Sequence, residues 1–101
     1  MKCIKELVEK IYEEIEDAES CAELAIQYAT EDRTLADTYI TLAKEEVNHM
    51  NRLHEQVVRV IAEYRSRNGE PPQAMTDIYN WEHNRIVKQA AQVQVVINSY
   101  K

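Results

Sequence analysis

Residues 4–28 read IKELVEKIYEEIEDAESCAELAIQY, and this stretch decides the fold. Its side chains at alternating intervals of three and four residues are mostly apolar, which is the spacing of one packed face of an α-helix. One glutamate interrupts this apolar stripe. The stripe consists of Ile4, Leu7, Ile11, Glu14, Ala18, Cys21, Ala25 and Tyr28.

A second stripe with the same spacing follows, and it is also interrupted at ionisable residues. It consists of Leu35, Tyr39, Leu42, Glu46, His49 and Leu53. An ionised carboxylate on a packed helix face is costly unless something compensates its charge. The two stripes place two carboxylates and one imidazole on packed faces, and Glu46 and His49 have the spacing Glu-x-x-His. This combination predicts a metal site inside a helical bundle.

The composition favours one all-α domain over residues 1–101. The chain has a single glycine, two prolines and no phenylalanine, and no Asn-Gly or Asp-Gly hairpin signal lies between alternating runs. A net charge of −6 argues against nucleic acid or an anionic membrane as the main partner. No run of residues approaches membrane-spanning length. The only cysteines, Cys3 and Cys21, imply no disulfide framework, and we therefore expect a cytoplasmic protein.

The break between the first two predicted helices is the polar stretch of residues 30–34. Thr30, Asp32 and Thr34 are all candidate N-caps for the helix that follows, because each side chain can accept a backbone hydrogen bond. A connection this short predicts an antiparallel hairpin. The predicted helices span about residues 4–30, 33–67 and 75–98.

The second break contains the only glycine of the chain, Gly69. Glycine provides a left-handed helix cap, and Pro71 and Pro72 prevent the helix from continuing. Thr76 is the expected cap of the third helix.

The hairpin gives a check on the proposed site that does not depend on the stripes. If the turn is centred near residues 30–32, Glu14 faces residues numbered in the high forties, where Glu46 and His49 lie. The three residues therefore share one level along the bundle as well as inward faces. The competing interpretation is that a glutamate-rich chain contains Glu-x-x-His by chance and turns its glutamates to solvent.

The third helix carries a stripe of its own, made of Tyr79, His83, Ile86, Ala90, Val93 and Ile97. His83 is expected to be a hydrogen-bonded interface residue, with metal ligation as the alternative. His54 lies five residues after His49, a spacing that predicts a surface or rim position. Tyr79 and Trp81 are expected to anchor helix packing, or alternatively to form a patch that binds a protein partner.

These residues resemble the ferritin-like superfamily, which includes rubrerythrins, encapsulated ferritins and short bacterial or prophage proteins. In that superfamily the first helix supplies a glutamate, often followed seven residues later by tyrosine, and the second supplies Glu-x-x-His. Here Glu14 and Ala18 are followed by Cys21 where the tyrosine is expected, and residues 42–50 read LAKEEVNHM. The resemblance covers about residues 5–65.

The resemblance implies that Glu14, Glu46 and His49 form half of a metal site, with Glu16 as a second candidate from the first helix. The other half would come from a second subunit, in a homodimer or ring of dimers that completes a four-helix bundle. The implied metal is iron, with manganese or zinc as alternatives, and the implied chemistry is iron oxidation. The alternative function is a non-catalytic structural or protein-interaction module, of phage origin, on the same frame.

Overall fold

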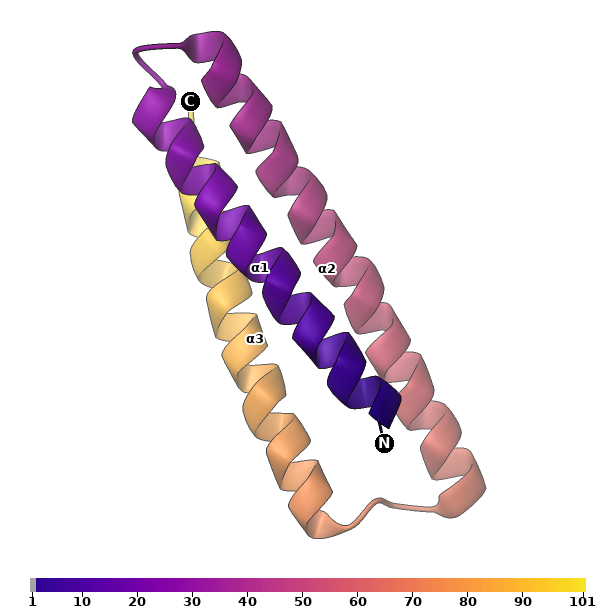
Figure 1. Ribbon diagram of the computed structural model, residues 1–101. Helices are drawn as coiled ribbons and strands as arrows, with labels where there is room; N and C mark the ends of the chain where they lie inside the picture. Colours follow the sequence, from indigo (N-terminus) through magenta and orange to yellow (C-terminus); the bar gives the residue numbers. More distant parts are fainter. Residues whose placement is uncertain (1) are drawn as a thin grey trace.

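The computed structural model describes residues 2–101 and contains three helices. They are α1 (Lys2–Tyr28), α2 (Arg33–Asn68) and α3 (Gln73–Ser99). Helix α2 runs antiparallel to α1, and α3 returns along the other flank of α1 (Figure 1). The prediction of an all-α chain with a long hairpin and a third helix is confirmed, and the described residues contain no strand.

A short connection with a side-chain cap sets the α1–α2 hairpin. Of the three candidate caps, Asp32 is the one that acts, because its Oδ1 accepts a hydrogen bond from the backbone N–H of Leu35 at 3.1 Å. Helix α1 ends at Tyr28, two residues before the predicted end. The backbone N–H of Asp32 still bonds to the carbonyl oxygen of Tyr28 at 3.0 Å, so the connection stays tight.

The α2–α3 connection follows the predicted chemistry at Gly69 but not at Thr76. Gly69 has φ 73°, in the left-handed region, and its N–H bonds to the carbonyl oxygen of Arg65. The prediction of Thr76 as the cap of α3 is wrong, because the helix already begins at Gln73. Pro72 supplies the carbonyl that accepts from the N–H groups of Met75 and Thr76, so no side-chain cap is used.

Helix α1 is the central element, because both other helices pack against it. Its buried side chains are two isoleucines followed by three alanines, and the small residues let the helices approach closely. The buried core consists of Ile11, Ile15, Ala18, Ala22, Ala25, Ala36, Ile40, Ala43, Met50, Val57, Ile86, Val93 and Ile97. The predicted α1 and α3 stripes are buried or half-buried along their length.

The packed face of α2 differs from the predicted stripe by one residue. The most buried positions are Ala36, Ile40, Ala43, Met50 and Val57. The predicted stripe is rotated by about 100° about the helix axis from these buried positions, since successive residues of an α-helix differ by that angle. It borders the core instead of forming it. The observed buried face of α2 packs mainly against α1, with few contacts to α3.

Polar and aromatic contacts attach α3 to the hairpin at two levels. Near the middle of α1, the Tyr12 hydroxyl donates to Glu82 Oε2 at 2.6 Å. At the C-terminal end of α3, Arg33 donates to the Lys101 carbonyl oxygen, and the Tyr100 hydroxyl donates to Asp37. Within residues 2–101, no helix combines the length and apolar character needed to cross a membrane.

Replacing Asp32 by alanine tests the cap of α2. We expect Asp32→Ala to lower the free energy of unfolding by about 1 kcal/mol, because the Leu35 N–H loses its acceptor. Asp32→Asn keeps an acceptor and should change stability little. Urea unfolding measures both variants, and equal losses in the two would contradict the capping role.

Titration of Tyr12 tests the α1–α3 contact. Burial, followed by the hydrogen bond to Glu82, raises the pKa of Tyr12 from 10.0 to about 12. The protonated phenol is therefore the form that stabilises the fold. Its contribution should be complete below pH 10 and lost as the pH rises towards 12. The free energy of unfolding should fall less steeply across this interval in Tyr12→Phe than in the parent chain, and parallel curves would contradict the contact.

Candidate metal centre

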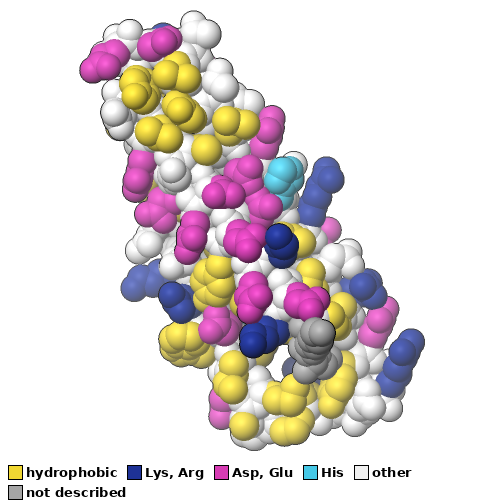
Figure 2. Space-filling view, viewed as in Figure 1, with side chains coloured by type: hydrophobic (Ala, Val, Ile, Leu, Met, Phe, Trp, Pro, Cys, Tyr) yellow, Lys and Arg dark blue, Asp and Glu magenta, His cyan; other side chains and the backbone are white. Residues whose placement is uncertain are grey.

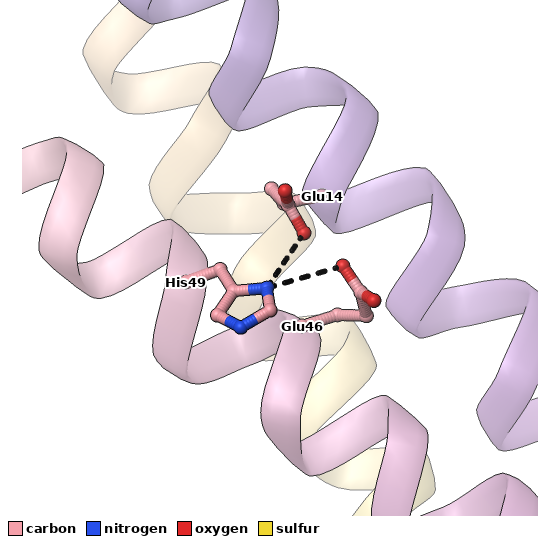
Figure 3. A group of neighbouring side chains, drawn as sticks. All are labelled: Glu14, Glu46 and His49. Atoms are coloured by element: carbon pink, nitrogen blue, oxygen red, sulfur yellow. Dashed lines mark ion pairs between the residues drawn. The ribbon is translucent and has the colours of Figure 1, made fainter.

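The hairpin brings Glu14 of α1 together with Glu46 and His49 of α2 (Figure 3). The His49 Nδ1 atom lies 3.4 Å from Glu14 Oε2 and 3.7 Å from Glu46 Oε2. One potential ligand atom from each residue falls within 4.8 Å of the others. Glu46 and His49 share a face of α2 because they are three residues apart, and the hairpin register places Glu14 opposite them.

The three side chains differ in exposure. The Glu14 and Glu46 side chains are each 23% exposed, whereas His49 is 53% exposed. The expectation that His49 is packed is therefore wrong, because it belongs to the α2 stripe that borders the core. The cluster has a buried side, formed by the glutamates, and an open side at the imidazole.

One oxygen of Glu14 lacks a hydrogen-bond partner. Glu14 Oε2 is buried, and no donor within the described residues bonds to it. Buried polar atoms in folded proteins are nearly always paired, and an unpaired one costs about 1–3 kcal/mol. The same oxygen is the Glu14 atom nearest to His49 Nδ1. An acceptor without a donor at the centre of a ligand-type cluster is where a cation fits.

The spacing of the three atoms suits one metal ion after small side-chain movements. Metal bonds of about 2.1 Å place neighbouring ligand atoms roughly 3.0–3.4 Å apart in octahedral or tetrahedral coordination. The two distances from His49 Nδ1 are close to that range. Two carboxylates and one imidazole form a donor set that suits iron and manganese and also accepts zinc.

A protonated His49 gives an alternative that needs no metal. An imidazolium would form ion pairs with both glutamates, but it carries one positive charge against two negative charges. Its 3.4 and 3.7 Å separations are also longer than charge-assisted hydrogen bonds. A divalent ion would neutralise both carboxylates and bond to the unpaired Glu14 oxygen.

The cluster lies on the side of the hairpin away from the Tyr12–Glu82 contact with α3, and we call this surface the hairpin face. Its members, mostly half-buried, are Leu7, Glu14, Cys21 and Tyr28 of α1 with Leu35, Tyr39, Leu42, Glu46, His49 and Leu53 of α2. The rings of Tyr28 and Tyr39 stack across the two helices, with centroids 6.3 Å apart. Figure 2 shows hydrophobic side chains over the end with the α1–α2 connection and a band of acidic side chains next to them. The open side of the cluster therefore has an apolar surface beside it.

The structure does not bring the other two ligand candidates to the cluster. Glu16 is exposed, and the group of ligand-type side chains found in residues 2–101 does not include it. His83 is half-buried and stacks on Tyr79 and on His54, with ring centroids 5.8 and 5.3 Å away. The interface position expected for His83 agrees with this stacking, whereas the hydrogen bond expected with it stays a prediction. His54, predicted at the surface or rim, is half-buried between α2 and α3.

Cys21 occupies the position at which the ferritin-like pattern has tyrosine. Its side chain is half-buried on the hairpin face and does not join the cluster. Burial, and then the nearby charge of Asp17, raise the pKa of the Cys21 thiol. The raised pKa favours the neutral thiol, and Cys21 lies outside the group of ligand-type side chains.

The fold and the cluster define this chain as an all-α protein with a carboxylate–histidine group on a helical hairpin. Comparison with protein-family models, with curated proteins and with solved structures finds no match for it.

The stability of the metal-free protein tests whether the buried Glu14 oxygen lacks a partner. In the presence of a chelator, above the pH range in which free imidazole titrates, Glu14→Leu should raise the free energy of unfolding by about 1 kcal/mol or more, because it removes an unpaired buried oxygen. The exposed Glu16→Leu change on the same helix should stay within about 0.5 kcal/mol. A large loss of stability in Glu14→Leu would show that the carboxylate is satisfied without metal.

Proposed function

We propose that this chain is a ferritin-like metal-binding protein whose half-site consists of Glu14, Glu46 and His49. The observation that carries the proposal is the buried Glu14 Oε2 atom, which lacks a hydrogen-bond partner and lies 3.4 Å from His49 Nδ1. A half-buried carboxylate on the second helix accompanies it. These features are what a site that binds a cation between two helices requires.

Each residue has a distinct part in holding the ion. Glu14 and Glu46 supply the negative charge that balances a divalent cation, and Glu14 is held in place because its helix packs on both neighbours. The Nδ1 atom of His49 supplies a neutral nitrogen ligand from the exposed side. Half-burial of the two carboxylates strengthens their attraction to the ion by limiting water around it.

The site is completed, in this proposal, by a second copy of the chain packed on the hairpin face. Three protein ligands leave coordination positions open, and the open side of the cluster is the exposed one. The apolar side chains beside it are incompletely covered, with Leu42 38% exposed. A two-fold axis through this face would pair two hairpins as a four-helix bundle and bring together four glutamates and two histidines.

The resemblance to ferritin-like proteins implies iron oxidation as the chemistry of the site. Ferrous ions held at this site would be the substrate. Two of them would reduce one hydrogen peroxide to two waters with uptake of two protons, and leave as ferric ions. Carboxylate ligands favour this direction because they stabilise the higher charge of the ferric ion.

The alternative is a structural module in which metal only joins two subunits. Cys21 favours it, since no phenol lies at that position of the hairpin face. Exposed apolar side chains on α3, including Trp81 at 59% exposure, are also available for a protein partner.

Metal binding is tested with variants that change one ligand each. Glu14→Gln, Glu46→Gln and His49→Gln should each lower the affinity for Mn²⁺ or Fe²⁺ at least tenfold, because a charged or strongly donating ligand is lost. The matched control is Glu45→Gln, an exposed neighbour with the same change of charge. Equilibrium dialysis with elemental analysis measures bound metal, and one ion per chain is expected. Equal binding by the Glu46→Gln and Glu45→Gln proteins would contradict the site.

Oxidation is tested separately on the metal-binding protein. Anaerobic Fe²⁺-loaded protein mixed with peroxide should develop ferric absorbance faster than Glu46→Gln protein does. Sedimentation with and without metal should show that the dimer requires the ion. Metal-dependent dimers without faster oxidation would favour the structural alternative, and a metal-bound monomer would contradict the shared site.

A further inference from the structure

An apolar cleft lies at the end of the molecule that contains the α2–α3 connection. Its volume is about 470 Å³, within the range of roughly 300–1,000 Å³ that is typical of small-molecule sites. Helix α1, the end of α2 and the start of α3 form its walls, and Pro71 of the connection lines it. The apolar wall includes Ile4, Val8, Ile61, Met75, Ile78 and Tyr79.

Unequal helix lengths create this cleft. Helix α2 has 36 residues and α1 has 27, so α2 is roughly 13 Å longer at 1.5 Å per residue. The end of α2 and the start of α3 thus extend past α1 and diverge from each other (Figure 1). Ile78 is 65% exposed at this end, so apolar surface remains uncovered where the two helices separate.

Several polar side chains of the cleft contact one another beside the apolar wall. The Tyr12 hydroxyl donates to one oxygen of the Glu82 carboxylate, Oε2. The Arg85 guanidinium carbon lies 5.2 Å from the centroid of the Tyr12 ring and 5.4 Å from that of Trp81. The two rings position the guanidinium without neutralising it, because an aromatic ring offers no formal negative charge.

Two cations of the cleft have no ion-pair partner in the described part of the chain. Neither Arg85 nor Lys5 has a carboxylate oxygen within 4.0 Å, whereas Arg65 is paired with Glu70. Two carboxylates also line the cleft, Glu9 and Glu82, and Glu82 accepts the hydrogen bond from Tyr12. The lining holds three cations, Lys5, Arg65 and Arg85, against two carboxylates, in a chain of net charge −6. This combination fits a ligand that is apolar along its length and carries one negative group.

We propose that the cleft binds a free medium-chain fatty acid, with its alkyl chain on the apolar wall and its carboxylate on Arg85. Arginine suits this partner because its planar guanidinium binds a carboxylate through two hydrogen bonds. The proposal is independent of the metal site. Tyr12 and Glu14 are on different flanks of α1, one towards α3 and one towards α2.

The test compares decanoate with decanol, which has the same chain without the charge. Calorimetry below the micellar concentration should show one decanoate per chain, bound about tenfold more tightly than decanol, which corresponds to about 1.4 kcal/mol. Arg85→Gln should remove this preference and leave decanol binding unchanged. The matched control Arg59→Gln, an exposed arginine paired with Glu63 on α2, should keep it.

A second variant tests the apolar wall without disturbing the core. Ile78→Ser should lower the affinity for decanoate and for decanol by a similar factor. The protein should still fold, because Ile78 is largely exposed. Equal affinities for decanoate and decanol, or an equal loss in Arg85→Gln and Arg59→Gln, would overturn the proposal. So would a change of oligomeric state in Ile78→Ser without ligand binding, because the cleft would then be a contact between copies of the chain.

Discussion

The register of the α1–α2 hairpin is the constraint on which the rest of the structure depends. The short connection capped by Asp32 leaves little freedom for the two helices to slide. It therefore fixes which residues of α1 face which residues of α2. The tight alanine packing of the core and the meeting of Glu14 with Glu46 and His49 both follow from that register. A shift of α1 by one helical turn along α2 would move Glu14 away from Glu46 and His49.

Helix α1 contributes residues to both candidate sites because it packs between the other two helices. One flank carries Glu14 and faces α2, and the opposite flank carries Tyr12 and faces α3. A carboxylate oxygen lacks a partner on the first flank, and a guanidinium lacks an ion-pair partner beside the second. In a chain this small, the unpaired buried oxygen of Glu14 reduces a modest folding free energy, and a bound cation would compensate it.

Much of the fold could be predicted from the sequence because its signals are local. Helical periodicity, Asp32 and Gly69 set the three helices to within a few residues of their observed bounds. The packed side of α2 could not be chosen in this way. Adjacent positions such as Leu35 and Ala36 are both apolar, so two neighbouring stripes satisfy the same period and the local pattern does not decide between them. The approach of the two glutamates and His49 could be predicted from the hairpin, but the exposure of His49 could not. The Tyr12–Glu82 hydrogen bond between α1 and α3 had no sequence signal, since it joins residues seventy positions apart.

The central claim is that each chain holds one cation between its first two helices and that a second chain completes the site. Anomalous diffraction from crystals grown with Mn²⁺ tests it most directly, since the signal locates the metal itself. The account predicts a peak bonded to Glu14 Oε2, a Glu46 oxygen and His49 Nδ1, next to a two-fold axis that brings the same residues from a second copy. A strong peak elsewhere, or crystals of the metal-soaked protein with no peak at these atoms, would contradict it.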